Sequence, residues 1–252
     1  MDEKRRRLLT GLSFASAGVL LNACRNTPSS TGGATNDEKK DEGPKPGEAE
    51  SVEVTATEDL MREHGILRRA LLVYQESATR LRGDAASVPP DALEKTANLF
   101  RVFGEDYHEK QLEETFIFPT VKKAPGAAPT YVDILLAQHV RGREITDYLL
   151  WVSKADRIPT NSVETLAKTL ESFVRMYEHH AAIEDTIIFP AWKSAIGQAE
   201  LDRLGEKFEE IEHEQFGTDG FETALERMAE IETSFGLSNL NMFTAPPPPL
   251  IK

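Results

Sequence analysis

Two stretches of the chain are alike and decide the fold: Tyr107–Pro119 reads YHEKQLEETFIFP, and Glu178–Pro190 reads EHHAAIEDTIIFP. Aligned without gaps, they agree at six of thirteen positions. The agreeing pairs are His108 with His179, Glu113 with Glu184, Thr115 with Thr186, Ile117 with Ile188, Phe118 with Phe189, and Pro119 with Pro190. Similar helix composition does not easily produce a matching His, Glu and Phe-Pro, so we interpret the stretches as an internal repeat.

Apolar residues recur at helical spacing around both copies of the repeat. This periodicity predicts helices from about residue 56 to 83, from 92 to 123, across 134 to 150, and from 162 to 197. Prolines interrupt the pattern between these segments. We therefore expect an all-α fold in which residues 56–197 form an antiparallel up-down four-helix bundle, built from two helical hairpins related by a pseudo-two-fold axis. Residues 198–238 are expected to add C-terminal helices, and residues 239–252 form a Pro-rich tail.

The second and fourth helices each carry a pair of candidate metal ligands. Residues four apart lie on the same face of an α-helix, so His180 and Glu184 can bind one ion, as can Glu109 and Glu113.

The first and third helices contribute one histidine each, His64 and His139, both among apolar neighbours. A lone histidine on an apolar face is more often a core residue than a ligand. Here all four helices carry a candidate, and Glu113 and Glu184 can each bridge two ions. The pattern predicts a two-metal site inside the bundle.

The residue types limit which metal the site binds. Cys24 is the only cysteine, which excludes a cysteine cage. Imidazole and carboxylate together suit iron, manganese or zinc, whereas calcium and magnesium prefer oxygen ligands alone. We expect two iron ions, with manganese and zinc as alternatives.

At these residues the sequence resembles the hemerythrin-like (HHE cation-binding) family, over about residues 57–195. The family pattern is His on helix one, His-x-x-x-Glu on helix two, His on helix three, and His-x-x-x-Glu on helix four. The residues that match it are His64, Glu113, His139, His180 and Glu184. The resemblance implies a non-haem di-iron centre that binds dioxygen.

Helix two departs from the family pattern. Glu109 stands where the family has histidine, and His108 precedes it by one residue. Either Glu109 is an oxygen ligand, which we favour, or the helix rotates or bulges so that His108 reaches the metal. In the second copy His180 already has the right phase, so His179 is interpreted as an outer or surface residue. His213 lies in an acidic run and is interpreted as part of a solvated face, with a supplementary ligand as the alternative.

The first 55 residues are interpreted as an export leader and a spacer. Arg5–Leu9 resembles a twin-arginine signal, and Leu21–Cys24 resembles the lipobox of bacterial lipoproteins, in which Cys24 is lipidated. The alternative is an ordinary secretory signal with a chance cysteine. Residues 25–55 have the polar composition of a disordered linker. We expect an exported, periplasmic or extracytoplasmic domain anchored to a membrane by lipid.

Charge and motifs restrict the function further. A net charge of −13 argues against nucleic-acid binding, and no nucleophile–base arrangement, Gly-rich phosphate loop or dinucleotide fingerprint is present. We expect a binding protein for dioxygen or a related diatomic or peroxide ligand, serving carriage, buffering or sensing. The alternatives are a di-iron oxidase, peroxidase or nitric-oxide detoxifying enzyme with an unidentified electron donor, and iron storage or scavenging. A histidine-rich set that includes His108 would favour reversible binding, and one with Glu109 would favour oxidase-like chemistry.

Overall fold

The computed structural model describes residues 54–155, 157–217 and 219–249. The leader, Cys24 and nearly all of the expected linker lie outside these residues. Within them all regular structure is helical, which confirms the all-α prediction.

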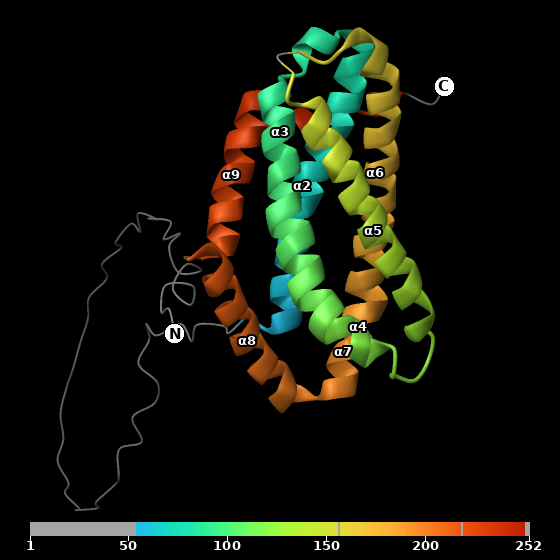
Figure 1. Cartoon of the computed structure of the whole chain (residues 1–252), viewed down its shortest axis with the longest axis vertical. Coiled ribbons are helices and arrows are strands. Elements are labelled where there is room, and N and C mark those ends of the chain that lie inside the picture. Colours follow the sequence, from blue (N-terminus) through green and yellow to red (C-terminus); the bar gives the residue numbers. More distant parts are fainter. Residues whose placement is uncertain (1–53, 156, 218, 250–252) are drawn as a thin grey trace, which may run out of the picture. The chain divides into compact units, whose positions relative to one another are not determined.

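Four antiparallel helical rods form the bundle (Figure 1). The first rod is α2 (Ala56–Gly83), and the third is α5 (Pro129–Val152). The second rod runs through α3 (Pro90–Leu99), the π-helix η3 (Phe100–Ile117) and α4 (Phe118–Val121). The fourth runs through α6 (Val163–Ile183), the π-helical turn η5 (Glu184–Ile188) and α7 (Phe189–Ile196). Short 3-10 turns, η2 (Ala85–Ser87) and η4 (Thr160–Ser162), lie in the connections.

Two further helices pack against the bundle, and a 3-10 turn, η6 (Leu240–Phe243), follows them. Helix α8 (Gln198–Phe216) contacts α2, η3 and α7, and α9 (Gly220–Phe235) contacts α2 and α3. Their buried faces include Phe208, Ile211 and Phe221. None of the helices described is both long and apolar enough to cross a membrane.

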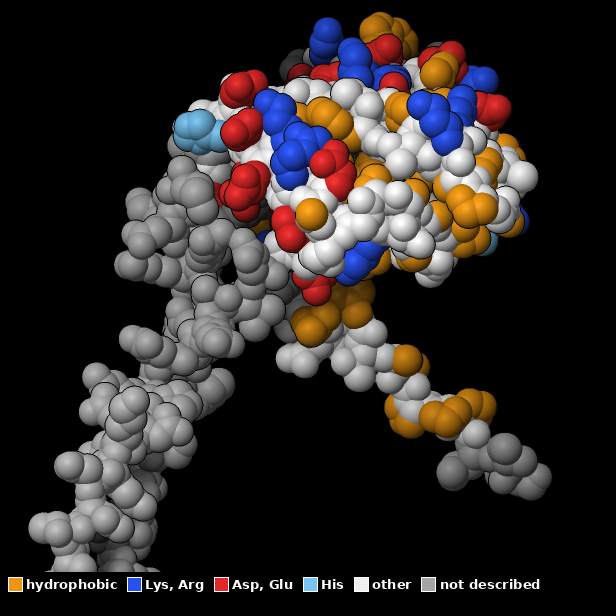
Figure 2. Space-filling model, turned by 90° about the horizontal axis from the view of Figure 1, so that it is seen from below, with side chains coloured by type: hydrophobic (Ala, Val, Ile, Leu, Met, Phe, Trp, Pro, Cys, Tyr) orange, Lys and Arg blue, Asp and Glu red, His pale blue; other side chains and the backbone are white. Residues whose placement is uncertain are grey.

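Local sequence explains where the rods begin and turn. Thr55 caps α2 because its side chain accepts from the backbone N–H of Glu58, whose carboxylate in turn accepts from the N–H of Thr55. Gly197 alone separates α7 from α8 with a φ of 75°, a backbone conformation that favours glycine. On the end of the bundle drawn in Figure 2, acidic and basic side chains are interspersed, with hydrophobic side chains scattered among them.

An aromatic cluster fills the core between the rods. The rings of Tyr74, Phe100, Phe173 and Tyr177 pack with centroid separations of 4.7–6.3 Å between contacting pairs, including Phe100 with Phe173 and with Tyr177. Tyr177 fits only because α5 has a glycine opposite it. A Cβ added to Gly142 would overlap the Tyr177 hydroxyl oxygen.

We expect Gly142→Ala to lower the free energy of unfolding by about 1–3 kcal/mol, because the methyl group overpacks a dense core and displaces Tyr177. Gly65→Ala in α2 is the matched control. Its added Cβ would have no atom within 4 Å beyond its chain neighbours and the adjacent backbone of its own helix, so helix propensity should stabilise the protein by up to about 1 kcal/mol. Chemical denaturation followed by circular dichroism measures both. Equal stabilisation by the two substitutions would contradict this account of the packing.

Candidate metal centre

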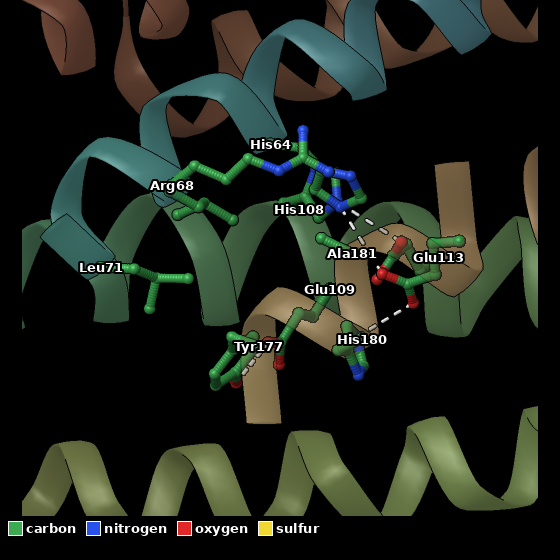
Figure 3. A pocket seen from close by; sticks show the side chains of 11 residues that line it. His64, Arg68, Leu71, His108, Glu109, Glu113, Tyr177, His180 and Ala181 are labelled. Atoms are coloured by element: carbon green, nitrogen blue, oxygen red, sulfur yellow. Dashed lines mark hydrogen bonds and ion pairs between the residues drawn. The ribbon is translucent and has the colours of Figure 1, made fainter. Parts of the chain in front are cut away.

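Six buried side chains converge inside the bundle, and every rod contributes to the group. They are His64 from α2, His108 and Glu113 from η3, His139 from α5, His180 from α6, and Glu184 from η5. None is more than 3% exposed. Figure 3 shows three of the histidines and Glu113 around one pocket.

The imidazoles form two pairs. His64 Nε2 lies 3.0 Å from His108 Nε2, and His139 Nε2 lies 3.1 Å from His180 Nε2. Two nitrogens held about 2.1 Å from one metal ion, at right angles, are about 3 Å apart. Each pair therefore has the spacing that one ion requires. We name the space beside His64 and His108 position A, and the space beside His139 and His180 position B.

Each of the two glutamates directs one oxygen to each position. Glu113 Oε1 lies 3.4 Å from His108 Nε2, and Glu113 Oε2 lies 3.4 Å from His139 Nε2. Glu184 Oε2 lies 3.5 Å from His64 Nε2, and Glu184 Oε1 lies 3.0 Å from His180 Nε2. Glu113 and Glu184 would each hold an ion at both positions.

The glutamate oxygens fit a pair of cations because no hydrogen bond satisfies them. All four oxygens of Glu113 and Glu184 are buried, and none accepts a hydrogen bond from the described part of the chain, so the histidine Nε2 atoms are their neighbours. Buried carboxylates without partners are costly, so they are normally paired or coordinate a metal. The donor set of four imidazole nitrogens and two bridging carboxylates suits a divalent transition metal.

Every histidine of the group uses its other ring nitrogen to bind a partner outside the centre. The Nδ1 contacts are His64 with Asp185 Oδ1 at 2.7 Å, His108 with Glu63 Oε2 at 2.6 Å, His139 with Glu114 Oε1 at 2.9 Å, and His180 with Gln138 Oε1 at 2.9 Å. Such contacts fix ring orientation and leave Nε2 directed inward, as is common for histidines that bind metal.

Comparison with known proteins agrees with this geometry. The family described as hemerythrin HHE cation binding domain matches residues 130–237. Three uncharacterized mycobacterial proteins, one from Mycobacterium bovis and two from strains of Mycobacterium tuberculosis, are each 39% identical to the chain over 241 residues, which cover 95% of this chain and 90% of the relative. The chain carries a hemerythrin HHE cation-binding domain and is a homologue of these mycobacterial proteins. No solved structure gives a significant match.

The hemerythrin match covers a different range from the expected one. It runs from α5 to α9 and includes His139, His180 and Glu184, whereas the resemblance in sequence spans about residues 57–195. The structure adds the half of the site that lies outside this match, since α2 and η3 bring His64, His108 and Glu113 to the same buried group. These buried His/Glu clusters are typical of a hemerythrin metal site.

The π-helix explains how His108 reaches the group. In a π-helix each carbonyl accepts from the residue five positions later, so residues five apart lie on one face. At the end of η3 the Phe118 N–H donates to the Glu113 carbonyl, five residues back. His108 and Glu113 are five apart and both turn toward position A, whereas His180 and Glu184 keep the four-residue spacing of an α-helix. The sequence repeat aligns His108 with His179, but in space its counterpart is His180.

Glu109 lies beside the centre and binds other groups. Its Oε1 accepts from the Tyr177 hydroxyl at 2.7 Å, and its Oε2 lies 3.1 Å from Arg143 Nη2. The nearest histidine contact is 3.9 Å, from Oε2 to His139 Nδ1. His108, and not Glu109 as we preferred, therefore faces the paired histidines, because the assumed α-helical phase does not hold in η3. Glu109 belongs instead to a separate group with Glu114 and His139 that could also hold an ion.

Two other candidate histidines point away from the centre. His179 and His213 are exposed, and neither belongs to the clusters found among the described residues.

The Phe-Pro ends of the repeat also have a structural role. Phe118 stacks on His139 and Phe189 stacks on His64, each with ring centroids 5.4 Å apart. Phe118 and Phe189 are also the residues at which the π-turns end, and the prolines after them have no N–H to place in the changed ladder. The phenylalanine of each helical hairpin thus packs against a histidine of the other hairpin.

Buried charges perturb one another across the group. Burial, followed by the Glu113 carboxylate, raises the pKa of Glu184 well above its usual range. Burial lowers the pKa of His180 to about 3. Burial also disfavours protonated His139, yet Glu109 and Glu113 raise its pKa to about 10. Without cations the group therefore retains protons on some members, and metal binding must displace them.

Sequence reasoning missed the outer partners Glu63, Glu114, Gln138 and Asp185. A signal for them exists, because each is the immediate chain neighbour of a residue in the group. It also missed Tyr177, which the apolar stripe of α6 hides.

Proposed function

We propose that this chain is a non-haem di-iron protein that binds dioxygen or a related small ligand. The observation that carries the proposal is the pair of positions A and B, joined by two buried carboxylates whose oxygens accept no hydrogen bond from the described residues. Imidazole and carboxylate in a helical bundle suit paired iron. Bound iron would supply redox chemistry and open positions for a ligand.

A pocket beside the centre supports a small ligand. Its cavity volume is about 10 Å³, enough for one very small molecule, and it is lined by His64, His108 and His180. Apolar walls come from Leu67, Leu71 and Ala181. Such walls suit a diatomic molecule and keep water from the site.

The histidine-rich donor set favours reversible binding over oxidase-like chemistry. Both positions face two imidazole nitrogens, since His108 rather than Glu109 turns inward. Glu109 is instead engaged by Tyr177 and Arg143. Positions A and B then each face two histidine nitrogens and two carboxylate oxygens. We therefore rank ligand binding above the enzymatic and iron-storage alternatives.

We expect the full chain, loaded anaerobically with ferrous iron and desalted, to hold about two irons. Admission of air should produce a new charge-transfer absorption that disappears when oxygen is removed. The matched variants are neighbours in sequence: His108→Ala should retain about one iron, and Glu109→Gln should retain two. Metal analysis and anaerobic optical titration measure both properties.

A chain that binds no iron would contradict the proposal. Irreversible bleaching with consumption of peroxide would favour the oxidase or peroxidase alternative, and many irons per chain would favour storage. Retention of two irons by His108→Ala, with loss in Glu109→Gln, would contradict the assigned geometry.

We also propose that the domain acts outside the cytoplasm, anchored by lipid on Cys24. This rests on the leader sequence alone, which lies outside the described residues. Cys24→Ala should move the protein from the membrane to the soluble fraction of a fractionated cell. An unchanged membrane fraction would contradict the lipid anchor.

The export route has a separate test. Replacing both Arg5 and Arg6 with lysine keeps the positive charge of the leader and removes the arginine pair, so it should block twin-arginine export. Fractionation should then recover the double variant in the cytoplasm. Export at the wild-type level would show that the arginine pair does not direct the protein.

A further inference from the structure

The internal repeat makes positions A and B alike in their inward-facing residues but not in all their outer partners. Glu63 precedes His64, and Gln138 precedes His139 at the corresponding place. Glu63 accepts from one histidine of position A, and Gln138 accepts from one histidine of position B. The repeat thus places a carboxylate in one half and a neutral amide in the other.

The contact in position A is with a carboxylate. Glu63 Oε2 lies 2.6 Å from His108 Nδ1, and the Glu63 side chain is only 1% exposed. Its other oxygen accepts from the Tyr107 hydroxyl at 3.2 Å. A carboxylate acceptor makes a shorter and stronger hydrogen bond than a neutral one, and burial reduces the screening of its charge.

The contact in position B is with an uncharged group. Gln138 Oε1 lies 2.9 Å from His180 Nδ1. An amide oxygen orients the ring but carries no net charge. His180 is therefore a weaker donor toward a cation than His108, because an outer carboxylate raises the basicity of an imidazole ligand.

The remaining two histidines do not differ in this respect. His64 is held by Asp185, which pairs with Arg68. His139 is held by Glu114, which pairs with Arg143. In both halves the arginine lies four residues after the histidine on the same helix.

Total charge does not explain a difference between the halves. Position A has Asp185, Glu63 and Arg68 around it, and the corresponding set at position B is Glu114, Glu109 and Arg143. Each set has two carboxylates and one guanidinium. Only the placement differs: Glu63 binds a histidine, and Glu109 binds the Tyr177 hydroxyl, at 2.7 Å.

We propose that position A binds divalent metal more tightly than position B and fills first, with Glu63 as the positioning residue that sets the order. This inference rests on the proposed metal pair and adds an order of loading to it. Outer partners of histidine ligands typically change metal affinity about 10–100-fold, so the two dissociation constants should differ by about this factor.

The test is a titration of the metal-free full chain with cobalt(II), followed by calorimetry and by visible absorption. The wild type should show two steps separated by at least about tenfold in affinity. Glu63→Gln should weaken the tighter step and bring the two together. Gln138→Glu, the reciprocal change, should tighten the weaker step and also bring them together.

Single-histidine variants identify which position fills first. His180→Ala should leave the tight step in place, and His108→Ala should abolish it, with a matching change in the absorption of the first equivalent of cobalt. Glu109→Gln is the charge control. It removes a carboxylate that lies 3.9 Å from His139 Nδ1 without a hydrogen bond to it, and should leave two separate steps. Circular dichroism confirms that each variant folds.

Two indistinguishable steps in the wild type, or a gap that Glu63→Gln leaves unchanged, would overturn the inference while leaving the metal pair intact. A tight step lost in His180→Ala and kept in His108→Ala would overturn it as well. A chain that binds no cobalt would overturn the metal pair and the inference together.

Discussion

The buried carboxylates of Glu113 and Glu184 are the constraint on which the rest of the structure depends. Their four oxygens lie among imidazole nitrogens and accept no hydrogen bond from the described residues. An ion in a low-dielectric interior costs several kcal/mol unless it is paired. Helices α2 and α5 bring His64 and His139 against these carboxylates, and the outer partners prevent the rings from turning away. Cations at positions A and B would offset the negative charge of these two carboxylates, which the apolar residues of the bundle core cannot neutralise.

Much of the fold was predictable from sequence. The six matching positions of Tyr107–Pro119 and Glu178–Pro190, together with the apolar periodicity, predict helical hairpins, and the structure is all-helical over the described residues. The repeat also identifies Glu113 and Glu184, which the structure places between the two histidine pairs. These inferences succeed because the burial pattern of a helix and the spacing of identical residues can be read directly from the chain.

Which residues of the second rod face the metal centre was not predictable in the same way. An α-helix places Glu109 and Glu113 on one face. In the π-helix η3, His108 lies on the same face as Glu113 instead. A proline inside an apolar helical pattern, as at Pro119 and Pro190, signals an altered hydrogen-bond ladder without giving the direction or extent of the change. The outer partners of the histidines were also not predictable from sequence. A polar residue beside a histidine can equally face solvent, and only the packing of the rods decides its direction.

The near-symmetry of the centre has a functional consequence. Two identical positions would bind metal without order, whereas the difference between Glu63 and Gln138 separates them chemically while the total outer charge stays the same. Glu109 is the carboxylate of position B that corresponds in charge to Glu63, and it contacts Tyr177 at the pocket. Gly142 makes room for that tyrosine, so packing in α5 and the polar edge of the pocket are coupled.

The most direct test is diffraction from crystals of the iron-loaded chain at wavelengths on both sides of the iron absorption edge. The account predicts two anomalous peaks about 3.5–4 Å apart. Each peak should lie about 2.0–2.3 Å from two histidine Nε2 atoms and from one oxygen of each of Glu113 and Glu184, with His108 at position A. A single peak, or a centre in which a Glu109 oxygen replaces His108, would contradict it.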